Sequence, residues 1–171
     1  VRDGLVAEYR FDEGRGQVLC DYSGNGNHGQ LGSTRKADTN DPLWTPQGLQ
    51  FDGENDYVSL GTVLRSMPTT EMTVGAIWNY TPAYEDGLIV PDEGDIFGAY
   101  NVESQPFGLF IKITSGRKLN IGGSISRGYI YYTEWLSEDF NFTVYHSSVL
   151  TYIKGISSAF YIDGTYIHSL N

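Results

Sequence analysis

Apolar residues in this chain come in short alternating segments that are separated by turn-forming residues. One such segment spans residues 4–11, with Leu5, Ala7, Tyr9 and Phe11 at every second position, and another spans residues 71–80. A period of two is that of a half-buried β-strand, whereas an amphipathic helix repeats every 3.6 residues. With 21 glycines and 13 tyrosines in the composition, we expect an all-β protein with many tight connections and little helix.

The length and charge of the chain limit its organisation and its partners. A chain of 171 residues can form one substantial core, so residues 1–171 are predicted to be a single domain. Its net charge of −10 argues against nucleic acid, which requires clustered Lys and Arg. The acidity suits a secreted protein that holds a divalent cation, and equally a charge that keeps the protein in solution. No apolar run has the length of a signal peptide or a membrane helix, so we expect no membrane span and place any export signal outside residues 1–171.

Residues 21–29, which read DYSGNGNHG, form the most distinctive turn of the sequence. Glycine supplies backbone angles that other residues avoid, and short Asp, Ser and Asn side chains hydrogen-bond to neighbouring amides. The run is therefore predicted to be a tight turn that is rich in oxygen atoms.

Three motifs follow one another at the start of the chain. GLVAEYRFDEG at residues 4–14 is followed by the turn at 21–29 and then by LQFDGENDYV at 49–58, which suggests a strand, an acidic turn and a second strand. This succession resembles the bacterial laminin G-like, concanavalin A-like jelly-roll family. The resemblance implies an antiparallel two-sheet jelly-roll β-sandwich, and an extracellular or cell-surface location.

The rest of the chain is consistent with that resemblance. Short strands are expected at 95–100, 107–113, 118–125 and 128–133, and Asp163-Gly164 between two alternating segments predicts a late hairpin. Family members continue with one more strand, and here the sequence ends at Asn171. Either a strand from the middle of the chain replaces it, or an open sheet edge is covered by another subunit of a homo-oligomer or by a neighbouring domain.

Calcium is the cofactor that the turns suggest. Calcium takes six to eight oxygen ligands, and glycine-rich turns let such ligands converge. The candidate ligands are Asp21, Asn25, Asn27, Asp52 and Asp163. The alternative is that Asp21, Ser23 and Asn25 form Asx-type turn hydrogen bonds and that the Asp-Gly pairs are plain turns.

The sequence does not predict catalysis. Laminarinase-like glycosidases of this fold carry Glu-x-Asp-x-x-Glu on one strand, and here Glu93 and Asp95 are followed by Gly98 in place of the last carboxylate. His28, His146 and His168 lack a partner at metal-ligand spacing, and Cys20 suits a small buried apolar residue.

Aromatic side chains outside the expected core are candidates for sugar binding, because a pyranose ring stacks on an exposed aromatic face. Residues 32–47 are predicted to be a long surface loop that exposes Trp44, and Tyr129, Tyr131 and Trp135 are the other candidates. The alternative is that these rings fill the space between two sheets.

The function expected from these features is a non-catalytic carbohydrate-binding or adhesion-type module whose ligand is a glycan. The alternative is a structural or assembly module of a surface or virion protein that a partner completes. A degenerate glycoside hydrolase is the least favoured of the three. One fold hosts many functions, so each of these depends on the site rather than on the fold.

Overall fold

The computed structural model describes residues 3–61, 70–80, 83–85, 88–90, 94–98, 107–114, 118–125, 128–135, 140–141, 143–153 and 157–170. Side chains are described at 3–61, 70–80, 140–141, 143–151, 153 and 159–167. Where the sequence predicts one domain, the structure divides the chain into two compact units, Val1–Met67 and Pro68–Asn171. Each unit is described by itself.

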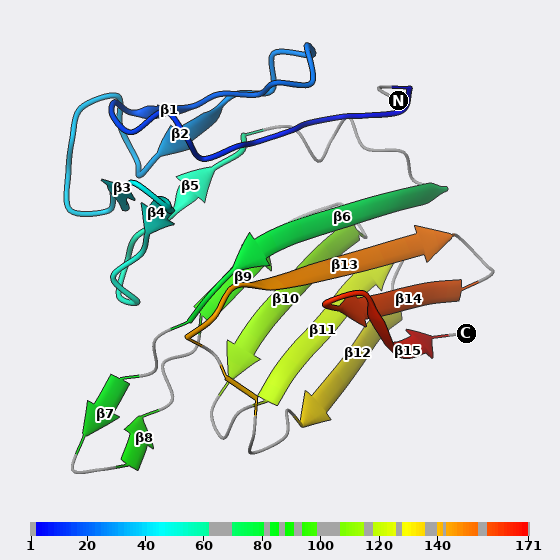
Figure 1. Cartoon of the computed structure of the whole chain (residues 1–171). Helices are drawn as coiled ribbons and strands as arrows, with labels where there is room; N and C mark the ends of the chain where they lie inside the picture. Colours follow the sequence, from blue (N-terminus) through cyan, green and yellow to red (C-terminus); the bar gives the residue numbers. More distant parts are fainter. Residues whose placement is uncertain are drawn as a thin grey trace. The chain divides into compact units, whose positions relative to one another are not determined.

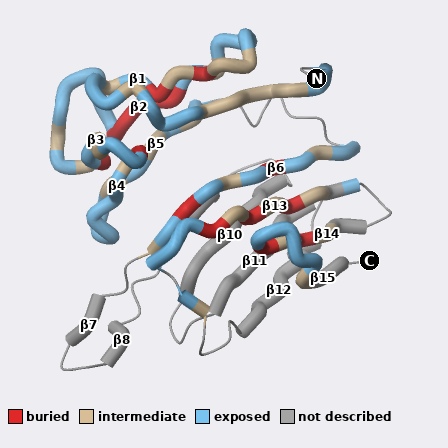
Figure 2. The backbone as a smooth tube through the Cα atoms, viewed as in Figure 1, coloured by how far each residue is buried: buried red, intermediate tan, exposed pale blue. Residues whose placement is uncertain are grey.

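The described part of the first unit contains five very short strands (Figure 1). A three-stranded sheet has the order β1 (Val18–Leu19), β2 (Gly29–Leu31) and β5 (Val58–Ser59), and β3 (Leu43–Thr45) pairs with β4 (Gly48–Gln50). Leu19 of β1 and Leu31 of β2 are each only 1% exposed, and Figure 2 shows buried backbone along β2. The predicted strands around the acidic turn exist as β4 and β5. They do not pair with each other, since β4 pairs with β3 and β5 pairs with β2.

The predicted strand at residues 4–11 is wrong. That stretch forms a single bridge, between Tyr9 and Asp21, and no ladder. Residues 5–9, the N-terminal segment, are all half-buried instead of alternating between buried and exposed. Phe11, expected on the core face, is 38% exposed and has a φ of 58°, which a β-strand does not allow. The physical reason is that side chains of the turn at 21–27, and not a neighbouring strand, bind the backbone of this segment.

The predicted surface loop at 32–47 is also wrong in part. Its last residues form β3, so Trp44 lies in a short hairpin and is half-buried rather than exposed. Gly32 and Pro42 are buried as well. The loop folds inward because Asp38, Asn40 and Asp41 hydrogen-bond to one another and to the acidic turn, where the Tyr57 amide donates to the Asn40 carbonyl at 3.2 Å.

The described residues of the second unit form two four-stranded antiparallel sheets and a small hairpin. Its strands are β6 (Glu71–Trp78), β7 (Ala83–Glu85), β8 (Leu88–Val90), β9 (Gly94–Gly98), β10 (Phe107–Thr114), β11 (Lys118–Ile125), β12 (Gly128–Trp135), β13 (His146–Ile153), β14 (Ser157–Ile162) and β15 (Thr165–Leu170). The sheet orders are β12-β11-β10-β9 and β15-β14-β13-β6, and β7 pairs with β8. Strands β6 and β9, which belong to different sheets, contact each other.

The alternation predicted for residues 71–80 is confirmed. Along β6 the even-numbered positions are buried or half-buried and the odd-numbered positions are exposed. Directly opposite residues of neighbouring strands share a face, so the pairs Val74 with Leu150 and Leu150 with Phe160 extend the buried face of β6 across β13 and β14. This face contains most of the described core of the unit (Figure 2).

The late hairpin is confirmed too. Strands β14 and β15 are joined by Asp163 and Gly164, with φ values of 50° and 75°. Positive φ at both central residues is what a type I′ turn requires.

All strand pairings in the described residues are antiparallel, and those residues contain no helix. The all-β class is therefore confirmed, and two antiparallel sheets fit a β-sandwich. In the part of the chain that is described, no helix is long and apolar enough to cross a bilayer.

Candidate functional site

Two networks of polar side chains, one in each unit, contain the buried aspartate and the buried histidine of the described residues. The first is the turn cradle, which we define as Asp21, Ser23, Asn25 and Asn27. Asp21 is only 8% exposed, and each of its carboxylate oxygens accepts two hydrogen bonds. Oδ1 accepts from the amides of Glu8 (3.0 Å) and Ser23 (2.8 Å), and Oδ2 from the Ser23 hydroxyl (2.8 Å) and the Asn27 amide (2.9 Å).

The other cradle residues bind the main chain of the N-terminal segment. The Val6 carbonyl accepts from Asn25 Nδ2 at 3.1 Å and from Asn27 Nδ2 at 2.8 Å, and it lies 3.2 Å from the Ser23 hydroxyl oxygen. Asn25 Nδ2 also donates to the Leu5 carbonyl at 2.7 Å. These side chains replace the ladder of a neighbouring strand, which explains why the segment is extended without being a strand.

The contacts at the cradle shift the pKa of Asp21 and that of Tyr9 in the N-terminal segment. Burial by itself would raise the pKa of Asp21, but the hydrogen bonds from Glu8, Ser23 and Asn27 outweigh it and hold the pKa well below its usual range. The Tyr9 hydroxyl donates to the Asn27 carbonyl at 2.5 Å, and burial, together with the Asp21 charge, raises the pKa of Tyr9 to about 12. At neutral pH the cradle thus holds an ionised carboxylate and a protonated phenol.

The calcium candidates lie in three separate turns. Asp21, Asn25 and Asn27 belong to the cradle, Asp52 to the acidic turn, and Asp163 to the hairpin of the second unit. Asp52 Oδ1 accepts from the amides of Glu54 (2.9 Å) and Asn55 (3.2 Å), and the amide groups of Asn25 and Asn27 donate to carbonyls. The oxygens of Asp21 would have to give up amide and hydroxyl donors to bind a cation.

The grouping of possible metal ligands bears on the calcium prediction. Among the described residues, which include all five candidates, no three His, Cys, Asp or Glu side chains are grouped so that they could hold a metal ion. The alternative interpretation fits the contacts, since the Ser23 amide on Asp21 and the Asn25 amide on the Ser23 hydroxyl (3.2 Å) are local turn bonds. Calcium binding stays a prediction for experiment.

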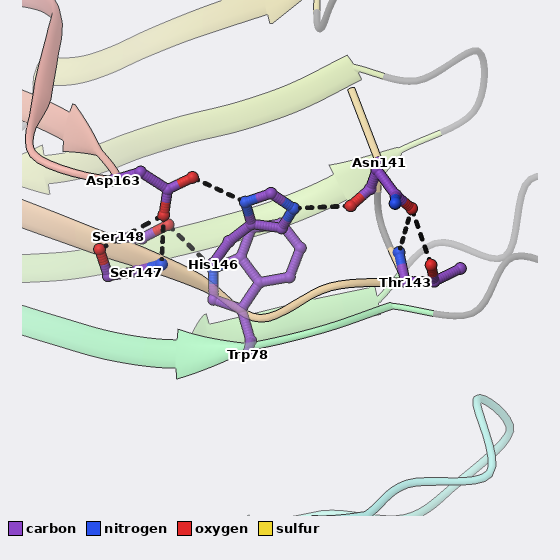
Figure 3. A network of polar contacts seen from close by, with 7 residues as sticks. All are labelled: Trp78, Asn141, Thr143, His146, Ser147, Ser148 and Asp163. Carbon is purple, nitrogen blue, oxygen red and sulfur yellow. Dashed lines mark hydrogen bonds and ion pairs between the residues drawn. The ribbon is translucent and has the colours of Figure 1, made fainter. Parts of the chain in front are cut away.

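The second network surrounds His146, the first residue of β13 (Figure 3). His146 is 7% exposed and lies opposite Trp78 of β6. Its Nδ1 is 2.7 Å from Asp163 Oδ2, and its Nε2 is 2.8 Å from the Asn141 carbonyl. Asp163 Oδ1 accepts from the Ser147 amide at 2.8 Å. The histidine thus joins the segment before β13 to the hairpin turn after β14.

The two ring nitrogens of His146 have different partners. The Asn141 carbonyl can only accept, so Nε2 carries a hydrogen. Burial by itself would raise the pKa of Asp163, but the contacts with His146 and Ser147 outweigh it and lower this pKa, so the carboxylate is ionised. The donor and acceptor roles at Nδ1 of His146 depend on the tautomer of the ring.

Aromatic rings and one hydroxyl complete the histidine network. The Phe140 ring is stacked on His146 with centroids 4.2 Å apart, and the Trp78 ring is tilted at 5.4 Å. Trp78 Nε1 donates to the buried Ser148 hydroxyl at 2.9 Å. Sequence reasoning found Asp163 as an isolated turn residue and set His146 aside. Parity could have placed His146 on a buried face, since His146, Ser148 and Leu150 occupy alternate positions of one strand.

The sugar-binding candidates are not brought together within one unit. Trp44 lies in β3, and its indole nitrogen donates to the Gly16 carbonyl at 2.8 Å, so the ring is tied to the first unit. Tyr129, Tyr131 and Trp135 all lie on β12 of the second unit, opposite Ser124, Gly122 and Lys118 of β11. Their side chains lie outside the described residues.

The remaining candidates have local roles or lie outside the described residues. The Asp21 amide donates to His28 Nδ1 at 3.1 Å, so that histidine stabilises its own turn. Cys20 is a half-buried free thiol, and burial, together with neighbouring Glu13, raises its pKa, which keeps the sulfur protonated. Asp95 and Gly98 belong to β9, while Glu93 and the side chain of His168 are outside the described part.

Comparison with known proteins gives one distant likeness. No family model matches the chain, and no curated protein matches it. The chain is similar to the crystal structure, at 2.1 Å, of residues 221–444 of an S-layer domain-containing protein from Clostridium thermocellum. The identity is 23% and the TM-score 0.45, over 96% of this chain and 71% of that one. A TM-score of this size does not establish a shared fold or function.

Proposed function

We propose that this chain is a non-catalytic structural module that serves as a building block of a surface or extracellular assembly. The proposal rests on the burial and the contacts of the two side chains best suited to act as a catalytic acid or base. Asp21 and His146 are each more than nine-tenths buried, and their oxygens or nitrogens are held by partners in the chain. A general acid, base or nucleophile must reach its substrate, at least through a water molecule.

The same contacts support a stabilising role for these groups. If Asp21 turned toward a substrate, it would leave part-buried amides without an acceptor, and a fully buried group in that state costs about 1–3 kcal/mol. If His146 turned away, the Asn141 carbonyl and the Asp163 carboxylate would lose their contacts with the ring. We also propose that the fold is the laminin G-like jelly roll that the motifs at residues 4–58 suggest.

A panel assay on the full chain tests the proposal. Wild type, His146→Gln and Glu93→Gln are assayed for hydrolysis of β-glucans and of ester and peptide substrates, and their melting midpoints are measured in parallel. We expect no turnover by any of the three, and a lower melting midpoint for His146→Gln. Turnover that His146→Gln or Glu93→Gln abolishes while the melting midpoint is retained would contradict the proposal.

Glycan binding is a second candidate function, favoured by one observation. Tyr129, Tyr131 and Trp135 occupy odd-numbered positions of β12, which ends its sheet among the described strands. Aromatic residues grouped on one strand would suit the apolar face of a sugar ring. A glycan array with wild type and Tyr131→Ala tests this function, and binding that the substitution removes would favour it over the structural role.

A further inference from the structure

The turn cradle binds the N-terminal segment almost entirely through the main chain of that segment. Apart from the contact of Tyr9, the cradle hydrogen bonds to this segment go to main-chain atoms, namely the Leu5 and Val6 carbonyls and the Glu8 amide. The Tyr22 amide adds a bond to the Glu8 carbonyl at 2.8 Å. The cradle therefore recognises an extended backbone and makes no use of most side chains of the segment.

Such contacts do not depend on which chain supplies the segment. The bonded residues are 13 to 21 positions apart in the sequence. Any copy of residues 5–9 that entered the cradle with the same direction would make the same bonds. Arg10, whose guanidinium lies 4.3 Å above the centre of the Tyr22 ring, would travel with it.

The connection between the segment and the rest of the unit is strained. Phe11 follows directly and has a φ of 58°, a left-handed conformation that is unfavourable for a bulky residue. Two residues later, Glu13 is fixed by the bond that its Oε1 accepts from the Cys20 amide at 2.7 Å. Only residues 10–12 therefore link the N-terminal segment to a fixed position, and short strained hinges favour exchange between copies.

We propose that the partner of the turn cradle is the N-terminal segment of a second copy of this chain, so that two copies exchange residues 5–9 and form a dimer. The proposal deepens the proposed structural function, on which it rests, by naming a second copy as the assembly partner. In the exchanged dimer every cradle contact is kept, and Phe11 is released from its left-handed conformation. The dimer is stabilised by relief of the strain at two hinges, one in each copy, and this relief offsets part of the entropy cost of association.

Two matched substitutions isolate the hinge. Phe11→Gly removes the strain because glycine adopts positive φ without cost, so the closed monomer no longer gains from opening. Phe51→Gly is the control, since Phe51 is also an exposed phenylalanine in a turn, at 48% exposed against 38% for Phe11, and has no positive φ. Both variants lose a similar apolar surface, and only one loses the strain.

The experiment uses the full chain in normal and nitrogen-15-labelled form, unfolded together in urea and refolded at high and at low protein concentration. Native mass spectrometry and light scattering then measure the dimer. We expect dimers of mixed isotopic composition for wild type and for Phe51→Gly, with about a tenfold smaller dimer fraction for Phe11→Gly. A monomer at every concentration, or a dimer fraction that Phe11→Gly leaves unchanged, would overturn the proposal.

A cross-link shows whether the dimer uses this segment. On a Cys20→Ser background, one tagged preparation carries Leu5→Cys and the other carries Asn25→Cys, because Asn25 contacts the Leu5 carbonyl. A short bis-maleimide should join the two differently tagged chains in the dimer. Dimers that form without this cross-link would mean that another surface is used, and the exchange would be ruled out. Neither result changes the turnover panel, so the proposed function can fail or survive separately.

Discussion

Each of the two units of this chain is stabilised by a different kind of contact. Strands of the first unit are two or three residues long, and its best-defined contacts are hydrogen bonds from the side chains of the turn cradle to the main chain. In the second unit both large sheets consist mainly of strands of six to eight residues, which pair along most of their length. Stability is thus concentrated in a few side chains in one unit and spread over many backbone bonds in the other.

This difference implies that the two units respond differently to single substitutions. A unit of about 67 residues buries a smaller fraction of its surface than a larger one, so each specific contact is a larger share of its stability. A ladder of equivalent bonds loses little when one side chain changes. The predictions below are arranged to break this comparison, beginning with the largest effect.

Asp21→Asn should have the largest effect. The new amide nitrogen would face donors that now bind a carboxylate oxygen, and we expect the first unit to lose about 3 kcal/mol of unfolding free energy. Hydrogen exchange read by mass spectrometry reports each unit separately, and the second unit should keep its protection. The exposed Asp3→Asn is the control and should change neither unit. Equal losses in both units would contradict the comparison.

Two glycines in strands provide a direct test of packing. A Cβ at Gly29 of β2 would lie 2.9 Å from Val58 Cγ1 and 3.2 Å from Leu19 Cβ, so Gly29→Ala should destabilise the first unit by about 1–3 kcal/mol. At Gly75 of β6 the nearest atoms would be 3.6 Å and 3.7 Å away, which is ordinary contact. Gly75→Ala should be neutral or stabilising by up to about 1 kcal/mol. Urea melts of both variants check this, and a larger loss at Gly75 would reverse our interpretation.

Ser148→Ala should have a moderate effect on the second unit. It leaves the buried Trp78 Nε1–H without an acceptor, which costs about 1–2 kcal/mol. Trp78→Phe already removes this bond, so Ser148→Ala should cost less in the Trp78→Phe variant than in wild type. A double-mutant cycle of unfolding free energies should therefore show coupling. Ser147→Ala removes only a longer bond of 3.4 Å and serves as the control. Additive effects of Ser148→Ala and Trp78→Phe would contradict the assignment.

The cradle should limit the stability of the first unit at both ends of the pH scale. The folded pKa of Asp21 lies below its unfolded value of about 3.9, so its contribution is complete above that pH and is lost as the pH falls through the folded pKa. For Tyr9 the folded pKa of about 12 lies above the unfolded value of about 10, so its contribution is present below pH 10 and is lost between 10 and 12.

Melting midpoints over the pH range check this prediction. Tyr9→Phe should flatten the alkaline decline of the first unit, and Asp21→Asn should flatten its acid decline. Tyr57→Phe is the control for the phenol, because Tyr57 is an exposed tyrosine of the same unit. An alkaline decline that Tyr9→Phe leaves unchanged would show that another group is responsible.

Calcium should have the smallest effect. Because protein donors already occupy the oxygens of Asp21 and Oδ1 of Asp52, we expect the same melting midpoint in calcium chloride and in EDTA. A ligand that binds only the folded state must raise the midpoint. A clear rise with calcium, removed by Asp52→Asn, would establish the cation site that the sequence predicts.

Several elements could be read from local sequence. The alternation in β6 and the Asp163-Gly164 hairpin were predictable because a two-residue period and a positive-φ turn are local properties of the chain. Residues 4–11 show the opposite case, since they have the same period and form no strand. Alternation states which backbone can extend, but pairing requires a neighbouring strand, and here side chains occupy that place.

The sequence by itself determined the all-β class, most strands of the second unit and the polar, self-bonded character of the turn at 21–27. Only the tertiary structure decided which main chain that turn binds and that His146 meets Asp163, because both contacts join residues far apart in the sequence. Such contacts depend on sheet register and chain direction, which no short pattern of residues encodes. Local rules therefore predicted elements, and long-range pairing decided how their polar side chains are used.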